Sequence, residues 1–253
     1  MNANPFDLTG KVAIVTGANT GIGQAIAVAL AEAGADIVAA GRTASIETEA
    51  QVRKAGRQFL SVAADLAGTG VIPDVIGQTV KHFGHLDILV NNAGIIRRAE
   101  ALDFTEADWD AVMDVNLKSV FFLSQAAARQ MLSQGRGGKI VNIASLLSFQ
   151  GGIRVASYTA AKSGLAGITR LLANEWAGKG INVNAIAPGY IATNNTDALQ
   201  KDEMRNRQIL ERIPAGRWGR PEDIGGGAVF LASRAADYLH GAIVPIDGGW
   251  LAR

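Results

Sequence analysis

The sequence predicts an α/β fold: a doubly wound, parallel sheet of about seven strands with helices on both faces. Short apolar runs rich in β-branched residues alternate with longer helical patterns along the chain. Several runs are apolar nearly throughout, which is typical of strands covered on both faces. No linker, low-complexity tract or internal repeat interrupts the alternation, so we expect a single domain over residues 1–253.

Seven runs have the length and composition of buried strands, and most are bounded by glycine, proline or polar turn residues. They occupy residues 11–17, 36–41, 58–65, 86–92, 138–145, 181–188 and 242–248. The segments between them, such as 23–34 and 227–236, have the apolar pattern of amphipathic or buried helices.

Composition excludes several classes of protein. The 24 basic and 23 acidic side chains leave a formal net charge of +1, which gives no support to nucleic-acid or membrane-surface binding. Cysteine is absent, and His82, His85 and His240 form no ligand pattern, so we expect no metal site. The start of the chain lacks a signal-like pattern and no long apolar stretch occurs, so a cytoplasmic protein is expected.

A glycine-rich turn follows the first predicted strand, and ligands bind such sheets at the carboxyl ends of the strands. The segment reads TGANTGIG, in which Gly17, Gly21 and Gly23 allow a tight turn and close approach of the backbone. The helix that follows points free N–H groups at a phosphate. The spacing differs from the common dinucleotide fingerprint, and the glycines alone also fit a purely structural turn. The glycine turn and the helix N-terminus together predict a Rossmann-type nucleotide-binding site at this position.

Polar residues also end the third and fourth strands. A carboxylate at Asp65 can accept a hydrogen bond from an adenine amino group, and Ala93 and Gly94 leave room for a ribose. The alternative is that Asp65 caps its own turn and that Asn91 and Asn92 satisfy nearby backbone groups.

Tyr158 and Lys162 lie four residues apart in the segment SYTAAKSG, so a helix presents both on one face. Ser145 ends the fifth strand, and chain direction can bring it to the same sheet edge. A nearby cation favours the phenolate form of tyrosine, so we expect Lys162 to lower the pKa of Tyr158. Tyr158 can then exchange a proton with a substrate alcohol or carbonyl whose oxygen Ser145 binds.

From about Leu8 onward the chain resembles the short-chain dehydrogenase/reductase family, because TGANTGIG, NNAG, DVNLKSV, Ser145, YTAAK and PGYIAT occur in the family's order. The resemblance implies hydride transfer between a nicotinamide and a carbonyl or alcohol. It implies that Tyr158 is the general acid/base, that Lys162 also binds the nicotinamide ribose, and that Asn116 anchors a proton-relay water. The residues expected to bind the coenzyme are Gly17, Asn19, Thr20, Gly21, Ile22, Gly23, Arg42, Asp65, Leu66, Asn92, Ala93, Gly94, Tyr158, Lys162, Pro188, Gly189, Ile191 and Thr193.

The second strand gives mixed evidence on the coenzyme. An acidic residue there binds the ribose of NAD, whereas an arginine accommodates the phosphate of NADP. Here Gly41 stands at the acidic position and Arg42 follows, which favours NADP; Thr20, where many NADP-dependent members carry a basic residue, weakens that case. Other segments resemble NAD-linked members of the family that act on deoxy sugar acids. We therefore expect NAD, with NADP a close second.

That closer resemblance implies a substrate such as 2-deoxy-D-gluconate or 2-dehydro-3-deoxy-D-gluconate. Arg98 and Arg154 are candidates for binding its carboxylate, with Gln150 and Asn194 for its hydroxyls and Ser145 for the reacting oxygen. The polar, helical stretch 193–217 is expected to form a lid over the ligands.

Two alternatives remain open: reduction of another carbonyl substrate such as a 3-oxoacyl thioester, and a catalytically silent dinucleotide-sensing protein. The resemblance also implies a homotetramer. Trp250 and Leu251, apolar at the end of the chain, are expected to be buried against another subunit, whereas Trp218 is expected to pack the lid.

Overall fold

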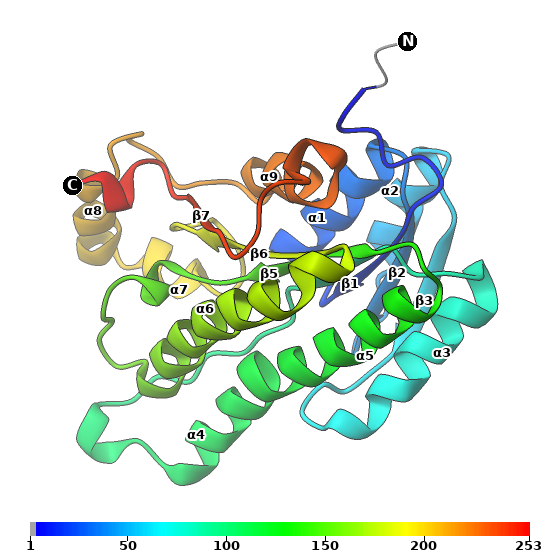
Figure 1. Ribbon diagram of the computed structural model, residues 1–253. Helices are drawn as coiled ribbons and strands as arrows, with labels where there is room; N and C mark the ends of the chain where they lie inside the picture. Colours follow the sequence, from blue (N-terminus) through cyan, green and yellow to red (C-terminus); the bar gives the residue numbers. More distant parts are fainter. Residues whose placement is uncertain (1–3) are drawn as a thin grey trace.

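The central sheet is parallel throughout. In the computed structural model, which describes residues 4–253, seven strands lie in the order β3-β2-β1-β4-β5-β6-β7 (Figure 1). The order reverses between β1 and β4, and a doubly wound sheet binds ligands at such a point. The strands are β1 (Val12–Thr16), β2 (Asp36–Gly41), β3 (Phe59–Ala63), β4 (Ile88–Asn91), β5 (Gly138–Ile143), β6 (Ile181–Pro188) and β7 (Ile243–Ile246).

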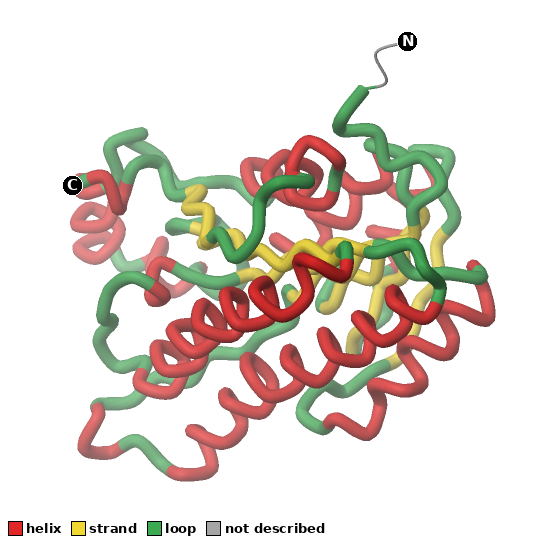
Figure 2. Tube along the Cα trace, viewed as in Figure 1, coloured by secondary structure: helices red, strands yellow, loops and turns green. Residues whose placement is uncertain are grey.

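Helices cover both faces of the sheet (Figure 2). Helices α1 and α9 pack together on one face, whereas α3, α5 and α6 cover the other. The helices are α1 (Gly21–Glu32), α2 (Ile46–Lys54), α3 (Ile72–Phe83), α4 (Glu106–Met113), α5 (Ser119–Ser133), α6 (Ala156–Trp176), α7 (Asp197–Lys201), α8 (Glu203–Arg212) and α9 (Glu222–Ala232).

Burial on both faces explains why the strands read as continuous apolar runs. In β1, Ala13 and Val15 pack toward α1 and α9, while Val12 and Ile14 pack toward the opposite helix layer. Alternate residues of one strand therefore serve two separate cores. The predicted fold class is confirmed, and each of the seven strands lies within its predicted run.

The carboxyl ends of two strands and the start of one helix differ from the predicted boundaries. Asp65 and Ser145 each lie two residues beyond the ends of their strands, in the turns. Helix α9 begins five residues earlier than the predicted residue 227, because its three glycines weaken the sequence signal. Close packing explains one of them, since a Cβ at Gly225 would lie 2.8 Å from the Ala29 Cβ of α1.

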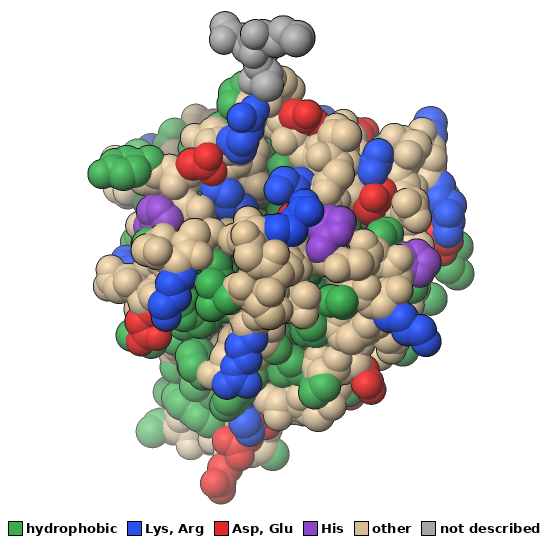
Figure 3. Space-filling model, turned by 45° about the vertical axis from the view of Figure 1, so that its right-hand side comes forward, with side chains coloured by type: hydrophobic (Ala, Val, Ile, Leu, Met, Phe, Trp, Pro, Cys, Tyr) green, Lys and Arg blue, Asp and Glu red, His purple; other side chains and the backbone are tan. Residues whose placement is uncertain are grey.

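The surface mixes the two signs of charge, and acidic and basic side chains are interspersed over the face shown in Figure 3. Within residues 4–253 we find no helix with the length and apolar character needed to cross a membrane. The prediction of no export signal falls partly on residues 1–3, which lie outside the described residues.

Candidate active site

A cavity of about 1020 Å³ opens at the carboxyl ends of the strands, lined by the turns that follow β1 through β6. Its volume is large enough for a dinucleotide together with a small substrate. Most of the predicted site residues line it: Gly17, Asn19, Thr20, Gly21, Ile22, Gly23, Arg42, Asp65, Leu66, Asn92, Ala93, Gly94, Arg98, Ser145, Gln150, Tyr158, Lys162, Pro188, Gly189, Thr193 and Asn194.

The turn between β1 and α1 depends on its glycines. Gly17 and Gly21 have φ angles of 65° and 57°, in the left-handed region that glycine adopts without strain. Gly23 is required for packing, since a Cβ there would lie 2.2 Å from the Gly17 carbonyl oxygen. No side chain caps the first turn of α1 at Thr20, so its backbone N–H groups remain available to an anion.

The NNAG turn holds this glycine turn in place. The Thr16 hydroxyl oxygen accepts hydrogen bonds from the backbone N–H groups of Asn92 and Ala93, each at 2.9 Å. The Asn92 amide donates to the carbonyl oxygens of Thr16 and Gly17 at 2.9 and 3.1 Å. Asn92 therefore satisfies local backbone groups, as the structural alternative for this motif proposed, while Gly94 remains at the cavity wall.

The end of β2 carries cationic and hydroxyl groups at the cavity. Gly41 ends the strand, and Arg42 and Thr43 follow it along the cavity wall. Asp65 also lines the cavity, and its carboxylate accepts a hydrogen bond from the Ala67 N–H at 3.0 Å, so it caps its own turn as well.

Asn116 occupies a π-helical segment, Asp114–Lys118, between α4 and α5. Such a bulge turns a side chain to a direction that a regular helix would not give it, and π-bulges often occur at functional sites. The buried Asn116 amide donates to the Ile95 carbonyl oxygen at 2.8 Å and accepts from the Ile95 N–H at 2.9 Å. The residue lies behind the cavity wall, where it fixes the turn after β4.

Ser145, Tyr158 and Lys162 lie together in the cavity, as the sequence predicts. The buried Lys162 ammonium donates to the Ile143 carbonyl oxygen at 2.6 Å and lies 5.6 Å from the centroid of the Tyr158 ring. Helix α6 carries the tyrosine and the lysine, and the turn after β5 carries the serine.

The expected lowering of the Tyr158 pKa is wrong for this structure. Burial raises the pKa of the Tyr158 hydroxyl, and this effect outweighs the hydrogen bond with Ser145 and the positive charge of Arg98, both of which lower it. Burial also lowers the pKa of Lys162 to about 8. The sequence pattern placed the lysine correctly but could not reveal how strongly burial acts on both groups.

Two predicted ligand residues lie elsewhere. Arg154 is exposed, and its guanidinium Nε lies 3.1 Å from a carboxylate oxygen of Glu100; it does not line the cavity. Ile191 is buried, and its side chain packs into the core beside α9. Its apolar side chain is more stable there than at a polar wall, so the other residues of the PGYIAT turn line the cavity and Ile191 does not.

Arg205 of α8 lines the cavity and was not predicted. Sequence reasoning had no means to choose it, since Arg207 stands two positions away in the same polar helix. Arg98 donates to the Asn195 carbonyl oxygen at 3.4 Å, whereas its neighbour Arg97 pairs with Asp108 at 3.1 Å. Among the described residues neither Arg98 nor Arg205 forms a salt bridge.

The segment after β6, which we propose as the lid, forms α7 and α8, and Leu199 and Arg205 of these helices line the cavity. Trp218 packs this lid: its indole N–H donates to the Asn206 side-chain oxygen at 2.7 Å. Trp250 corrects an expectation, because it is buried within its own chain, with its ring against Tyr190 and beneath Arg212. Its indole gains both an apolar contact and a cation there without a second subunit.

Comparisons with known proteins agree with this geometry. A family model described as enoyl-(acyl carrier protein) reductase matches residues 17–251. The chain is 61% identical to the 2-dehydro-3-deoxy-D-gluconate 5-dehydrogenase of Escherichia coli (strain K12) over 253 residues, which is 100% of both chains.

Solved structures of two relatives match the fold. One, provisionally described as a 2-deoxy-D-gluconate 3-dehydrogenase from Agrobacterium tumefaciens with bound NADP, has 63% identity and a TM-score of 0.94, covering 99% of this chain and 100% of that one. Another, provisionally described as an NAD(P)-dependent gluconate 5-dehydrogenase from Beutenbergia cavernae with NADP at low occupancy, has 49% identity, a TM-score of 0.94 and the same coverage. The chain belongs to the short-chain dehydrogenase/reductase family.

Proposed function

We propose that this protein is an NADP(H)-dependent oxidoreductase that interconverts the hydroxyl and keto forms of a deoxy sugar acid, with 2-dehydro-3-deoxy-D-gluconate as the substrate. The observation that carries the proposal is the convergence of Ser145, Tyr158 and Lys162 in one cavity with the glycine turn. Identity of 61% over the full length to a dehydrogenase of this acid supports the choice of substrate.

The cavity residues fit a dinucleotide. The uncapped N-terminus of α1 and the left-handed glycines of its turn suit a pyrophosphate, which needs N–H donors and close approach to the backbone. When bound, the nicotinamide supplies or accepts the hydride. The turns carrying Pro188, Gly189 and Thr193 lie on the same cavity as Tyr158 and would contact the nicotinamide end.

The end of β2 leads us to place NADP before NAD, which reverses the order expected from the sequence. At Gly41 the protein has no side chain to accept a hydrogen bond from a ribose hydroxyl. Arg42 and Thr43 supply a cation and a hydroxyl donor at the same wall, and these suit a phosphate. Two relatives of known structure hold NADP, which supports this order.

Proton transfer falls to Tyr158 in this proposal. Burial keeps its pKa high, so at neutral pH the hydroxyl is protonated and can donate to a carbonyl oxygen that gains a hydride. Ser145 is placed to hydrogen-bond that same oxygen. In the oxidative direction Tyr158 must first lose its proton, so alcohol oxidation is expected to accelerate as pH rises.

We expect the substrate to bind beside arginine side chains of the cavity. Arg98 and Arg205 both line it, and an unpaired guanidinium matches a carboxylate. This charge favours a sugar acid over a 3-oxoacyl thioester, whose reacting end is uncharged. A dinucleotide sensor would not require Ser145, Tyr158 and Lys162 together.

A matrix of coenzymes and substrates tests the proposal. We expect purified protein to oxidise or reduce the deoxy sugar acid with NADP(H), measured by absorbance of the reduced nicotinamide, and to leave 3-oxoacyl thioesters unchanged. Arg42→Ala is expected to raise KM for NADPH at least about tenfold and to leave NADH use nearly unchanged, because a charged hydrogen bond contributes about 1.5–3 kcal/mol. Equal losses with both coenzymes would contradict the assignment of Arg42, and activity with thioesters alone would overturn the substrate.

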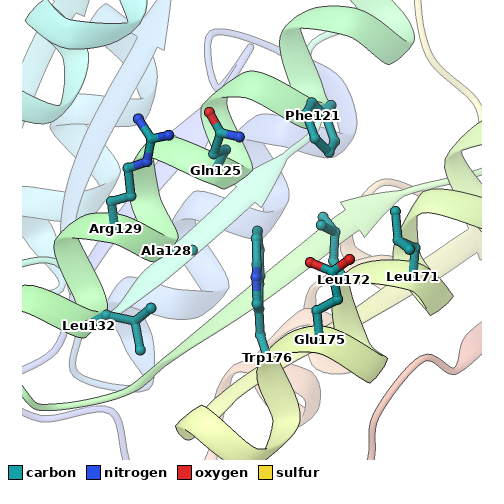
Figure 4. Close-up of a pocket in the computed structure, with 9 residues that line it drawn as sticks. All are labelled: Phe121, Gln125, Ala128, Arg129, Leu132, Leu171, Leu172, Glu175 and Trp176. Atoms are coloured by element: carbon teal, nitrogen blue, oxygen red, sulfur yellow. The ribbon is translucent and has the colours of Figure 1, made fainter.

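The oligomer is also part of the proposal. A shallow groove of about 220 Å³ runs between α5 and α6, and Figure 4 shows Trp176 and Leu132 at its edge. Leu171 and Phe122 of the same helices are 48% and 41% exposed. A largely apolar groove that also contains Gln125, Arg129 and Glu175 suits a second copy of the chain, and we propose that it contributes to a homotetramer.

A further inference from the structure

The amide of Gln150 has a fixed orientation in the cavity. Its oxygen accepts two hydrogen bonds, from the Trp250 indole N–H at 3.3 Å and from the Arg212 guanidinium at 3.4 Å. An indole N–H and a guanidinium can only donate. The amide therefore has to present its oxygen to these two groups, and the alternative flipped orientation would oppose donor to donor.

The other end of the amide is available. Gln150 lines the cavity and is only partly buried, and within residues 4–253 its nitrogen has no hydrogen-bond partner. The N–H groups of Gln150, and not its oxygen, are therefore the part of this amide that is left to bind a ligand in the cavity.

Positive charge strengthens this donor. The Arg212 guanidinium lies 4.0 Å from the Trp250 ring centroid, which holds it beside the Gln150 oxygen. A cation at the oxygen draws electron density from the amide and makes its N–H groups better donors to an anion. Arg98, which also lines the cavity, adds to the positive potential.

We infer that Gln150 donates a hydrogen bond to the substrate carboxylate, and that Trp250 and Arg212 are the positioning residues that fix its orientation. The inference rests on the proposed function, because it requires a carboxylate substrate. It also revises the assignment of Gln150 to a substrate hydroxyl, since a hydroxyl can use either end of an amide and a carboxylate can use only the donor.

The three residues come from three parts of the fold. Gln150 belongs to the turn after β5, Arg212 ends lid helix α8, and Trp250 begins the C-terminal 3-10 turn Trp250–Ala252. Arg253 strengthens the connection, since its guanidinium donates to the Arg212 carbonyl oxygen at 3.3 Å. The end of the chain therefore ties the lid to a substrate-binding side chain.

Gln150→Glu separates the acceptor role of the Gln150 oxygen from the donor role of its nitrogen. A carboxylate at this position keeps both acceptor contacts and adds an ion pair with Arg212, so the fold and the melting temperature are preserved. It removes the donor and places a negative charge against the substrate. We expect KM for the sugar acid to rise at least about tenfold, in line with loss of a charged hydrogen bond, while the Kd for NADPH stays within about twofold of wild type.

Trp250→Phe tests the positioning role separately. It keeps the aromatic contact with Tyr190 and Arg212 and removes one donor, so KM is expected to rise about two- to fivefold, the effect of a neutral hydrogen bond. Gln51→Glu on α2 and Trp109→Phe on α4 are matched controls that do not line the cavity. Both are expected to keep wild-type KM.

The outcomes distinguish the two proposals. If wild type turns over the sugar acid and Gln150→Glu has the same KM, Gln150 does not donate to the carboxylate and the inference fails while the proposed function stands. If Gln150→Glu raises KM but Trp250→Phe matches its control, Trp250 does not position Gln150 and that part of the inference is overturned. If wild type turns over no sugar acid, the proposed function and the inference both fall.

Discussion

At the scale of single residues, burial controls the chemistry of the site. Tyr158 and Lys162 both face the cavity, and for both the largest influence on the pKa is removal from water. Burial favours the neutral form of each group, so it raises the pKa of the phenol and lowers that of the amine. The lysine lies close to the tyrosine ring, but its ammonium is bound to the Ile143 carbonyl oxygen.

A consequence for stability follows from Lys162. Its pKa is about 8 in the folded protein and near its ordinary value of 10.5 when unfolded. Between these values the unfolded chain binds more protons, so the contribution of Lys162 to stability increases as pH rises through this window. Below the folded pKa the cost of burying the charge is present in full.

We therefore expect the wild type to gain stability relative to Lys162→Met as pH rises. The difference in the free energy of unfolding should change by about 1–2 kcal/mol between about pH 7.5 and about pH 9.5, since one pKa unit corresponds to about 1.4 kcal/mol. Denaturant unfolding of both proteins at the two pH values measures it. A constant difference would show that folding does not change the pKa of Lys162, and a difference that falls as pH rises would show a raised pKa; either result would contradict the lowered pKa.

At the scale of elements, an ion pair joins the end of the proposed lid segment to α9. Asp223 at the start of α9 binds the Arg217 guanidinium through both carboxylate oxygens, at 2.6 and 3.1 Å, and also accepts from the Arg220 N–H at 2.7 Å. The Arg217 contact above all, together with the Arg220 N–H, holds the pKa of Asp223 at about 2. The pair is therefore intact at any pH well above this value.

Asp223→Asn is expected to weaken substrate binding more than it lowers the stability of the fold. The lost free energy of unfolding should be about 1 kcal/mol or less, because the arginine is largely exposed and water screens the pair. KM for the sugar acid should rise about two- to tenfold, a cost of up to about 1.4 kcal/mol in binding. Steady-state kinetics and thermal unfolding measure both effects.

The control for this variant is Asp237→Asn, which breaks the Lys139–Asp237 pair at the amino end of β5, away from the cavity. We expect its KM to equal that of wild type. An equal rise in KM in both variants would indicate a general effect of lost ion pairs and would contradict a role for Asp223 in the lid.

The sequence predicted elements better than contacts. Apolar runs without alternation were enough to place seven buried strands, because burial on both faces constrains every position. The sequence could not show that Arg98 lines the cavity and Arg154 does not, because Arg154 forms a salt bridge with Glu100 that arises only in the folded chain. It likewise could not place Arg205, whose position depends on which face of α8 turns toward the cavity.

At the scale of the whole molecule, the cavity is lined by segments from most of the chain. The groove between α5 and α6 is lined by residues of α6, the helix that also carries Tyr158 and Lys162 (Figure 4 shows Leu171 and Trp176 of this helix). A partner copy bound to this surface would pack against α6 and restrict the movement of this helix.

Leu171→Glu tests this surface. A carboxylate at this position would lose its hydration on association, so we expect the variant to form a smaller species than wild type in light scattering coupled to size exclusion. Leu102→Glu is the matched control, because Leu102 is 99% exposed in a turn outside the groove. A Leu171→Glu variant with the mass of wild type would contradict the proposed interface.

The central claim is that the Tyr158 hydroxyl transfers the proton in the reaction. Its most direct test is Tyr158→Phe, assayed in both directions with NADP(H) and by titration of NADPH. We predict that turnover falls by about 100- to 10,000-fold, the usual contribution of general acid–base catalysis, while the Kd for NADPH changes by less than about twofold. Turnover close to that of wild type would show that another group supplies the proton and would contradict the mechanism.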